Sequence, residues 1–436
     1  MDQLPQRDIG DRTSVDSPTR SSHKTSSCSS LCSTTVLPLV PSPNPVSEWK
    51  PFLVFINPQS GGNQGYSLLH KFRCALNQRQ VFDLSQNGPK TGLQLYNGVP
   101  NLRILACGGD GTVSWVLSTI EELNMAPAPP VAVLPLGTGN DLSRTLGWGS
   151  RYTGEPISKV LRNIEFGEVV QLDRWKVEFE SQAGITTTFH EADDMSVQMP
   201  VISALPVKVF NNYFSLGADA AATLGFHESR EKNPERFNSR LQNKMAYARY
   251  GGKDILLRSW KNLSEYITLH CDGNDFTPLI RSLKPHVLLF LNIPKYSSGT
   301  LPWGTAPPDP GFEPARIDDG LLEVIGLSSA ALALIQVGGH GDRICQCRTA
   351  TLTTSKNVPV QLDGEPYRLL PSRIEIRHSH RASVVRKCGG QIISFPNTRV
   401  NLVLKNNKSQ SVLICDRSQG KYASAVGKPV TFRQAG

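Results

Sequence analysis

Three apolar segments in the first half of this chain each run into a glycine-rich loop, and this repeat restricts the possible folds more than any other feature. The segments are 52–56, 103–107 and 131–136. Apolar residues then recur at helical spacing over 113–123, and a helix is also expected over about 65–76. Strand, loop and helix repeated in this order predict a parallel sheet flanked by helices.

The second half has a different pattern, in which short apolar strands alternate with turns such as Asp272-Gly273. One predicted helix, over 236–250, interrupts them. This spacing is typical of an antiparallel sheet or sandwich. We therefore expect an α/β N-terminal lobe followed by a mainly antiparallel, β-sandwich-like lobe. The strands predicted in the second lobe are 207–216, 266–271, 286–293, 320–327, 348–353, 358–362 and 373–377.

Composition divides the 436 residues into five parts. Residues 1–47 contain 11 Ser, 5 Thr and 6 Pro, so we expect a disordered leader. The two lobes are predicted over 48–185 and 207–387, with a polar, acidic insertion or linker over 186–206 between them. A basic tail is predicted over 388–436.

The formal net charge of +9 is unevenly placed. Residues 366–436 contain 13 Lys and Arg against 2 Asp and Glu, a net charge of +11. Such a stretch is either a solvated basic tail or a region attracted to anionic lipid or nucleic acid.

Nine cysteines, an odd number, are scattered along the chain, which argues against a disulfide scaffold and favours a reducing, intracellular compartment. The longest apolar runs are shorter than the roughly 18 residues that cross a bilayer. The N-terminus also lacks the apolar segment of a secretory signal. We therefore expect a protein that spans no membrane.

The three glycine-rich loops follow strands of one predicted parallel sheet, so they should line one edge of it. Glycine lets backbone N–H groups approach a phosphate, and the helix behind each loop adds the positive end of its dipole. These loops therefore indicate a polyphosphate ligand. The sequence contains neither the P-loop motif nor the motifs of protein kinases.

Asp110 lies between glycines in the second loop, where phosphates are expected. A carboxylate there repels a polyphosphate unless a cation lies between them, so we expect Asp110 to act through Mg²⁺. A second, compatible interpretation is that Asp110 caps the helix that follows it.

Together the loops resemble the catalytic domain of the eukaryotic diacylglycerol kinases. The motifs are Asn57-Pro58-x-Ser60-Gly61-Gly62, Gly108-Gly109-Asp110-Gly111-Thr112 and Leu136-Gly137-Thr138-Gly139-Asn140-Asp141-Leu142. The second half resembles the accessory domain of these kinases, through Asn211-Asn212-Tyr213-Phe214-Ser215-Leu216-Gly217, Asn292-Ile293-Pro294, Asp318-Asp319-Gly320 and Leu362-Asp363-Gly364-Glu365-Pro366. Residues 82–86 and 103–107 most resemble the zeta and iota types, and the resemblance covers about 50–387.

The resemblance implies transfer of the γ-phosphoryl group of ATP to diacylglycerol to give phosphatidic acid, with ATP and Mg²⁺ as cofactors. Asp363 would be the general base with Glu365 as its partner, and Asp110 would act at the phosphates and the metal. Asp141 would contact the lipid, and Asp319 would hold a structural Mg²⁺. The residues implied in ATP binding are Asn57, Ser60, Gly61, Gly62, Gly108, Gly109, Gly111, Thr112, Gly137, Thr138, Gly139 and Asn140.

Simpler interpretations stay open for two of these residues: Asp363 also fits a hairpin turn, and Asp319 also fits a solvated turn.

The resemblance implies peripheral contact with membranes that contain diacylglycerol and anionic lipid, a cytoplasmic or nuclear location, and no nucleic-acid partner. The zinc modules and ankyrin repeats of zeta-like kinases do not occur in this sequence, so we expect a catalytic core on its own. The alternatives are a lipid kinase that acts on sphingosine or ceramide, and a catalytically silent adaptor.

Overall fold

The computed structural model describes residues 50–181, 201–202, 208–232, 260, 262–305, 311–388, 390–394, 400–405, 411–416 and 421–426. All described residues belong to one unit of the chain, Ser47–Gly436. The predicted leader, the predicted helix over 236–250 and most of the predicted insertion therefore lie outside the described residues.

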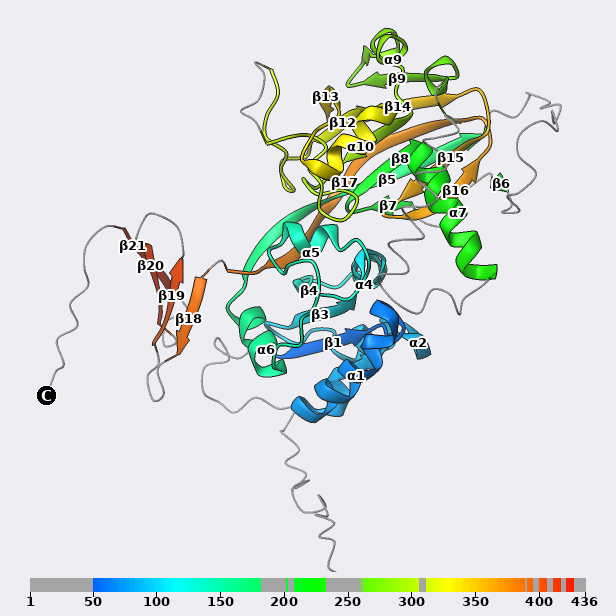
Figure 1. Cartoon of the computed structure of the whole chain (residues 1–436). Coiled ribbons are helices and arrows are strands. Elements are labelled where there is room, and N and C mark those ends of the chain that lie inside the picture. Colours follow the sequence, from blue (N-terminus) through cyan, green and yellow to red (C-terminus); the bar gives the residue numbers. More distant parts are fainter. Residues whose placement is uncertain are drawn as a thin grey trace, which may run out of the picture. The chain divides into compact units, whose positions relative to one another are not determined.

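The first lobe is built on four parallel strands, which are β1 (Phe52–Ile56), β2 (Val81–Asp83), β3 (Arg103–Gly108) and β4 (Val131–Pro135). They lie in the order β2-β1-β3-β4 (Figure 1). The residues of β3 and β4 are buried throughout, as expected for parallel strands that are covered on both faces.

Helices cover both faces of this sheet. Leu53 and Phe55 of β1 pack against α3 and α4, whereas Val54 and Ile56 pack against α1 and α6, because successive strand residues face opposite sides. The predicted parallel sheet flanked by helices is thus confirmed. The helices of this lobe are α1 (Ser60–Ala75), η1 (Gln78–Gln80), α2 (Leu84–Asn87), α3 (Lys90–Leu95), α4 (Asp110–Glu122), α5 (Asp141–Thr145) and α6 (Ile157–Glu165).

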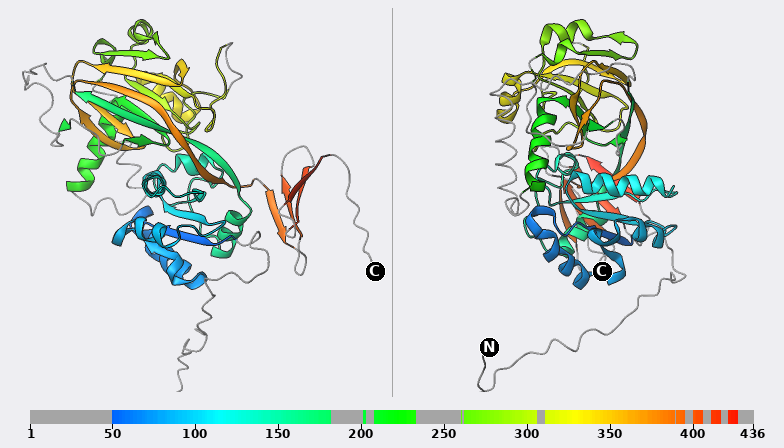
Figure 2. Two further views of the ribbon diagram at one scale, coloured as in Figure 1. Left: turned by 180° about the vertical axis from the view of Figure 1, so that it is seen from behind. Right: turned by 90° about the vertical axis from the view of Figure 1, so that its right-hand side faces the viewer.

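The sheet of the first lobe continues into the second lobe through one long strand, β17 (Ser372–Arg386). Near its end β17 pairs in parallel with β4, and along its length it pairs antiparallel with β5 (Glu168–Ser181). Figure 2 shows β17, in orange, passing from one lobe to the other. The other strands of this ten-stranded sheet are β7 (Val209–Phe210), β9 (Ile267–Cys271), β10 (Asn274–Asp275) and β14 (Thr349–Thr354).

A second sheet of seven strands packs on the ten-stranded sheet in the second lobe. Phe214 and Phe290 of the second sheet share one buried cluster with Leu269 and Leu352 of the first, which confirms the predicted sandwich. All pairings in it are antiparallel except that of β16 with β6. The strands are β6 (Val201–Ile202), β8 (Tyr213–Gly217), β11 (Val287–Leu291), β12 (Leu322–Leu327), β13 (Asp342–Cys347), β15 (Val358–Leu362) and β16 (Glu365–Leu369), and the helices of the lobe are α7 (Ala218–Lys232), η3 (Leu263–Glu265), α9 (Thr277–Leu283), α10 (Ser329–Leu334) and η4 (Ile335–Val337).

The C-terminal stretch contains a third sheet of four antiparallel strands, β18 (Gly390–Ser394), β19 (Val400–Lys405), β20 (Ser411–Asp416) and β21 (Lys421–Val426). Each pairs with the next along the chain. No helix in the described ranges is both long and apolar enough to cross a bilayer.

One predicted strand is wrong in its extent. The strand expected over 207–216 is divided into β7 and β8, because Asn211 and Asn212 leave the sheet. The cause lies in the hydrogen bonds that these two residues make at the candidate site.

Candidate functional site

The loop after β1 contains the first of the predicted phosphate-binding residues. Gly61, Gly62 and Asn63 have φ angles of 67°, 67° and 68°, a left-handed conformation that glycine adopts without steric cost. The regular part of α1 therefore begins after Asn63, close to its predicted start. A Cβ on Gly61 would lie 2.8 Å from the backbone oxygen of Leu136, so this loop lies against the end of β4.

Asn57 lies at the junction of β1 and this loop. Its backbone N–H donates to the oxygen of Cys107 on the neighbouring strand (3.0 Å), and its side-chain Oδ1 accepts from the N–H of Gln59 (3.2 Å). These bonds hold the start of the first loop beside the end of β3.

The second and third loops touch through glycines. A Cβ on Gly137 would lie 2.5 Å from the Cα of Gly109, and one on Gly108 would lie 2.2 Å from Oγ1 of Thr112. Side chains cannot be added at Gly137 or Gly108 unless their neighbours move. The two loops meet at one edge of the sheet, as the sequence predicts.

Asp110 joins these two loops. Its carboxylate accepts hydrogen bonds from the N–H groups of Asp141 (3.0 Å) and Leu142 (3.1 Å), the first residues of α5. Burial raises the pKa of Asp110. The interpretation of Asp110 as the cap of its own helix is wrong, because the N-cap of α4 is Gly109 and the carboxylate instead caps α5.

Asn140 and Asp141 present buried oxygens without hydrogen-bond partners, Oδ1 in each case. The Nδ2 group of Asn140 donates to the oxygens of Gly137 and Ser150, both at 2.8 Å, and Oδ2 of Asp141 accepts from the N–H of Ser298 at 3.1 Å. Burial and the nearby charge of Asp110 raise the pKa of Asp141 to about 7. This position thus carries a carboxylate that titrates near neutral pH.

Asp363 is held by the segment that interrupts β7 and β8. Its Oδ1 accepts from the N–H groups of Asn212 (2.7 Å) and Tyr213 (3.0 Å), and its Oδ2 accepts from the N–H (2.8 Å) and Nδ2 (3.3 Å) of Asn211. Four donors match the four acceptor positions of a carboxylate. Burial, with a smaller contribution from Asp110, raises the pKa of Asp363 to about 6.

The second lobe meets the loops of the first at this point. The side chain of Asn212 is hydrogen-bonded to Asp110, and its Oδ1 is buried without a partner. A Cβ on Gly111 would lie 3.8 Å from Oε1 of Glu365, whose pKa is raised by burial. We call this junction the interlobe site; it comprises residues 108–112, 137–141, 211–213 and 363–365.

Arg174 of β5 contacts the interlobe site through Asn211. No role for this residue is predicted from the sequence. Its side chain is fully buried, and its Nε donates to Oδ1 of Asn211 at 2.9 Å. Its two terminal nitrogens donate at 2.8 Å to Glu121 and Ser118 on α4. One guanidinium therefore connects the helix behind Asp110 to the segment that holds Asp363. Arg174 is one of several charged residues in β5, so no sequence pattern identifies this role.

Asp319 lies in the turn before β12, where Oδ1 accepts from the N–H of Leu321 at 3.0 Å. Burial, and then the charge of Asp173, raise its pKa. Within the described ranges no group of three closely spaced metal-binding side chains includes Asp319 or the carboxylates of the interlobe site. The role of Asp319 in binding Mg²⁺ stays a prediction.

Comparison with known proteins identifies both lobes. Residues 51–173 match the model of the diacylglycerol kinase catalytic domain, and residues 209–366 match that of the diacylglycerol kinase accessory domain. The chain is 55% identical over 350 residues to diacylglycerol kinase zeta of Homo sapiens, and 56% identical over 338 residues to diacylglycerol kinase iota of Homo sapiens. These alignments cover 80% and 78% of this chain.

The same alignments cover 37% and 31% of the two relatives, so the chain spans well under half of either one. A crystal structure of a diacylglycerol kinase from Bacillus anthracis str. Sterne aligns with 77% of this chain and 97% of its own, with a TM-score of 0.46 and 15% identity. From its two domain matches and its identity to the zeta and iota enzymes, the chain belongs to the diacylglycerol kinase family.

Proposed function

We propose that this chain is an ATP-dependent diacylglycerol kinase, which transfers the γ-phosphoryl group of ATP to 1,2-diacylglycerol and yields phosphatidic acid. The observation that carries the proposal is the interlobe site, where two glycine loops meet Asp110, Asp363 and Glu365. Relatives named diacylglycerol kinase zeta and iota support it through their identity to both lobes. The reaction would consume diacylglycerol and so attenuate its signal.

Phosphoryl transfer requires positioned phosphates more than covalent chemistry by the protein. The contact of Gly109 with Gly137 leaves backbone rather than side chains at this edge of the sheet, which suits a triphosphate that approaches N–H groups closely. We assign ATP to these two loops and to the loop after β1.

The hydroxyl of the acceptor loses a proton as the new bond forms, and a carboxylate of the interlobe site must take it. A base works best when its pKa is close to the working pH, and that of Asp363 is about 6. We assign this step to Asp363 with Glu365 beside it. To accept the proton, Asp363 must release one of its four hydrogen bonds.

Mg²⁺ fits the interlobe site by the chemistry of its oxygens. Oδ1 of Asp141 and Oδ1 of Asn212 are buried without partners, and oxygens of carboxylates and amides are ligands that Mg²⁺ prefers. We infer that these two residues would hold the ion together with Asp110, which is hydrogen-bonded to both. When bound, Mg²⁺ neutralises part of the charge of the triphosphate.

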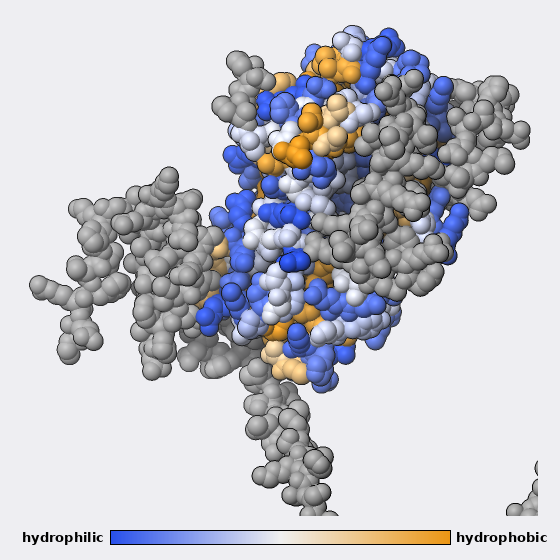
Figure 3. Space-filling view, viewed as in Figure 1, coloured by the Kyte–Doolittle hydropathy of each residue, from blue (hydrophilic) through white to orange (hydrophobic). Residues whose placement is uncertain are grey.

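We further propose peripheral contact with membranes, at a cytoplasmic or nuclear location. Leu334 of α10 and Val337 of η4 are 53% and 81% exposed, and Figure 3 shows apolar side chains on the face of the second lobe that carries α10. Replacing both by Asp should weaken sedimentation with vesicles that contain diacylglycerol and anionic lipid. Leu95→Asp, at a residue of the first lobe that is 63% exposed, is the control and should not weaken it.

The activity is tested by incubating the chain with radiolabelled ATP and mixed micelles that contain diacylglycerol, sphingosine or ceramide in separate reactions. We expect label in phosphatidic acid. Gly137→Ala should abolish transfer because the added methyl requires Gly109 to move. Gly98→Ala lies outside the interlobe site and has open space around its Cβ, but its φ of 78° strains the turn, so it should lower the melting temperature without abolishing transfer. Label only in the sphingosine or ceramide reaction would assign the related lipid kinase. A folded chain that labels none of the three would be the silent adaptor.

A further inference from the structure

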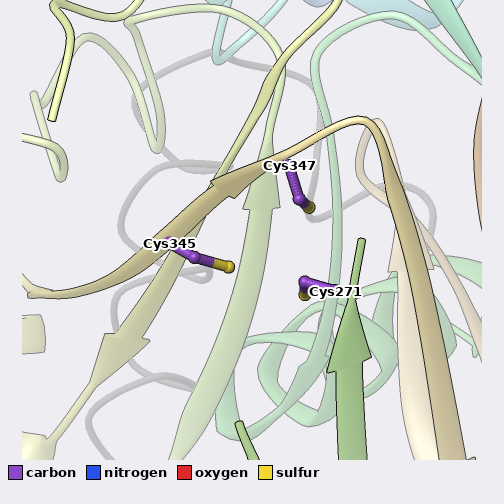
Figure 4. Close-up of side chains that lie close together, drawn as sticks. All are labelled: Cys271, Cys345 and Cys347. Carbon is purple, nitrogen blue, oxygen red and sulfur yellow. The ribbon is translucent and has the colours of Figure 1, made fainter. Parts of the chain in front are cut away.

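Three cysteine side chains meet inside the second lobe, and the proposed kinase reaction uses none of them. Cys271, Cys345 and Cys347 are 1%, 8% and 1% exposed, and their sulfur atoms all lie within 4.8 Å of one another. Figure 4 shows the three side chains converging from two separate strands. Within the part of the chain that the structure describes, this is the one group of three metal-binding side chains with such spacing.

The crossover between the two sheets brings these cysteines together. Cys345 and Cys347 are two positions apart on β13, in the seven-stranded sheet, whereas Cys271 ends β9 in the ten-stranded sheet. The chain leaves β13 at Arg348 and enters β14, where Ala350 pairs with Cys271. The group therefore spans the two sheets of the sandwich at the point where the chain passes from one to the other.

Asp272 fixes the geometry of this crossover. Its carboxylate accepts hydrogen bonds from the N–H groups of Arg348 (3.0 Å) and Thr349 (2.8 Å), and the hydroxyl of Thr349 donates to it at 2.9 Å. The residue after Cys271 thus anchors the two residues after Cys347. These hydrogen bonds alone hold the backbone of Cys271 close to that of Cys347, without a bond between the sulfur atoms.

The spacing of the sulfur atoms suits a metal better than a disulfide. Zn²⁺ binds thiolates at about 2.3 Å in tetrahedral geometry, which separates the sulfur atoms by about 3.8 Å. Sulfur atoms already within 4.8 Å need to move by about 1 Å or less to reach that geometry. A disulfide would join only two of the three sulfur atoms, at about 2.0 Å, and would leave the third cysteine buried without a role. In this structure all three cysteines are free thiols.

We propose that Cys271, Cys345 and Cys347 bind one thiophilic d¹⁰ metal ion of the Zn²⁺ type, which joins the two sheets of the second lobe. Binding forms three metal–sulfur bonds and releases three thiol protons to the solvent, with no change in oxidation state. A water would complete the fourth position of the ion.

The test is titration of the full-length, reduced and chelator-treated chain with Co²⁺, followed by displacement with Zn²⁺. We expect a thiolate-to-cobalt charge-transfer band that saturates at one equivalent, its loss when Zn²⁺ is added, and a higher melting temperature with Zn²⁺ bound. Cys345→Ser removes one sulfur at nearly constant volume and should weaken Co²⁺ binding by more than about tenfold. The matched control replaces Cys28 and Cys32 by Ser, which should leave the band unchanged.

A second measurement does not depend on how the variants fold. Zn²⁺ should slow the alkylation of Cys271, Cys345 and Cys347 in the unaltered chain, as followed by peptide mass spectrometry, relative to exposed Cys74. A chain that gives no charge-transfer band and shows no such protection would overturn the proposal, as would a band that disappears in the Cys28 and Cys32 variant. Neither measurement requires kinase activity, so this proposal and the proposed function fail separately.

Discussion

The carboxylate of Asp363 holds three backbone N–H groups, those of Asn211, Asn212 and Tyr213. Asp363→Asn turns an NH₂ group toward some of these donors, so we expect a lower melting temperature as well as slower turnover. A general base contributes about 10² to 10⁴-fold, and turnover should fall by that amount while the Michaelis constant for ATP changes only a few-fold. Steady-state kinetics and thermal unfolding of the purified variant measure the two effects.

Glu365→Gln is the comparison, because Glu365 belongs to the same turn but accepts none of these three backbone hydrogen bonds. It should keep the melting temperature of the parent and lose less turnover. If Asp363→Asn is fully active, Asp363 is not the base, and Asp110 becomes the first candidate.

Asp141 makes stability depend on pH in a defined direction. Its pKa is raised from about 4 in an unfolded chain to about 7 by burial and by Asp110. The folded chain therefore loses stability as the pH rises from about 4 to about 7, and the loss stays constant at higher pH. Asp141→Asn removes this loss, so denaturant unfolding should show a larger gain in stability at pH 8 than at pH 5, together with lower kinase activity.

Glu323 provides a comparison outside the interlobe site. Burial raises its pKa to about 8, and its Oε2 is buried without a partner. Glu323→Gln should therefore also stabilise the chain, increasingly from about pH 4.5 to about pH 8, yet leave turnover unchanged. Equal gains at pH 5 and pH 8 in either variant would contradict the assigned pKa direction.

At the scale of elements, Arg174 connects α4 to the segment between β7 and β8. Arg174→Lys cannot bond to Asn211, Glu121 and Ser118 at once, and a buried polar group left without a partner costs about 1 to 3 kcal/mol. We expect that loss in chemical denaturation. We also expect slower turnover with little change in the Michaelis constant for ATP, because Asn211 holds Asp363.

Arg377→Lys is the control for the chemical change alone, since Arg377 pairs with Glu178 on the exposed surface of the same sheet. Exposed ion pairs contribute at most about 1 kcal/mol, so its stability and turnover should stay close to those of the parent. If Arg174→Lys has the same stability and turnover as Arg377→Lys, the buried hydrogen bonds of Arg174 do not position Asp363.

The same elements show what a single sequence can predict. The segments that form β1, β3 and β4 are mostly apolar and are followed by Asn-Pro or glycine-rich loops, and β15 ends at an Asp-Gly turn. The predicted ends of these strands therefore agree with the structure within a residue or two. β5 was not predicted and β17 was predicted only in part, because both are long, half-exposed strands whose charged residues dilute the alternation.

The residues of the candidate site also differ in whether the sequence alone could predict them. The glycine loops and Asp363 belong to local motifs, so the sequence was enough to select them, and the structure brings them together. Arg174 depends on contacts with residues more than thirty positions away in the chain, which no local pattern records. The break at Asn211 and Asn212 also depends on a distant carboxylate, that of Asp363.

At the scale of the whole molecule, β17 makes the two lobes depend on each other. It pairs with β14 and β5 in the second lobe and reaches β4 of the first lobe near its end. Val384 packs into the core on one face of the first-lobe sheet and Val385 into the core on the other. The C-terminal end of the second lobe therefore contributes residues to both hydrophobic cores of the first lobe. This contribution crosses the boundary that the sequence predicts between the two lobes.

A chain of residues 48–206 should therefore not fold cooperatively by itself. It contains β5 without the strand that pairs along its whole length, and it lacks Val384 and Val385. The matched control, residues 48–388, keeps β17 and omits β18 to β21, which pair with one another. Far-ultraviolet circular dichroism and tryptophan fluorescence should give one coincident thermal transition for 48–388 and no cooperative transition for 48–206. A cooperative transition in 48–206 would mean that its core forms without β17, and that the continuous sheet joins two lobes that fold independently.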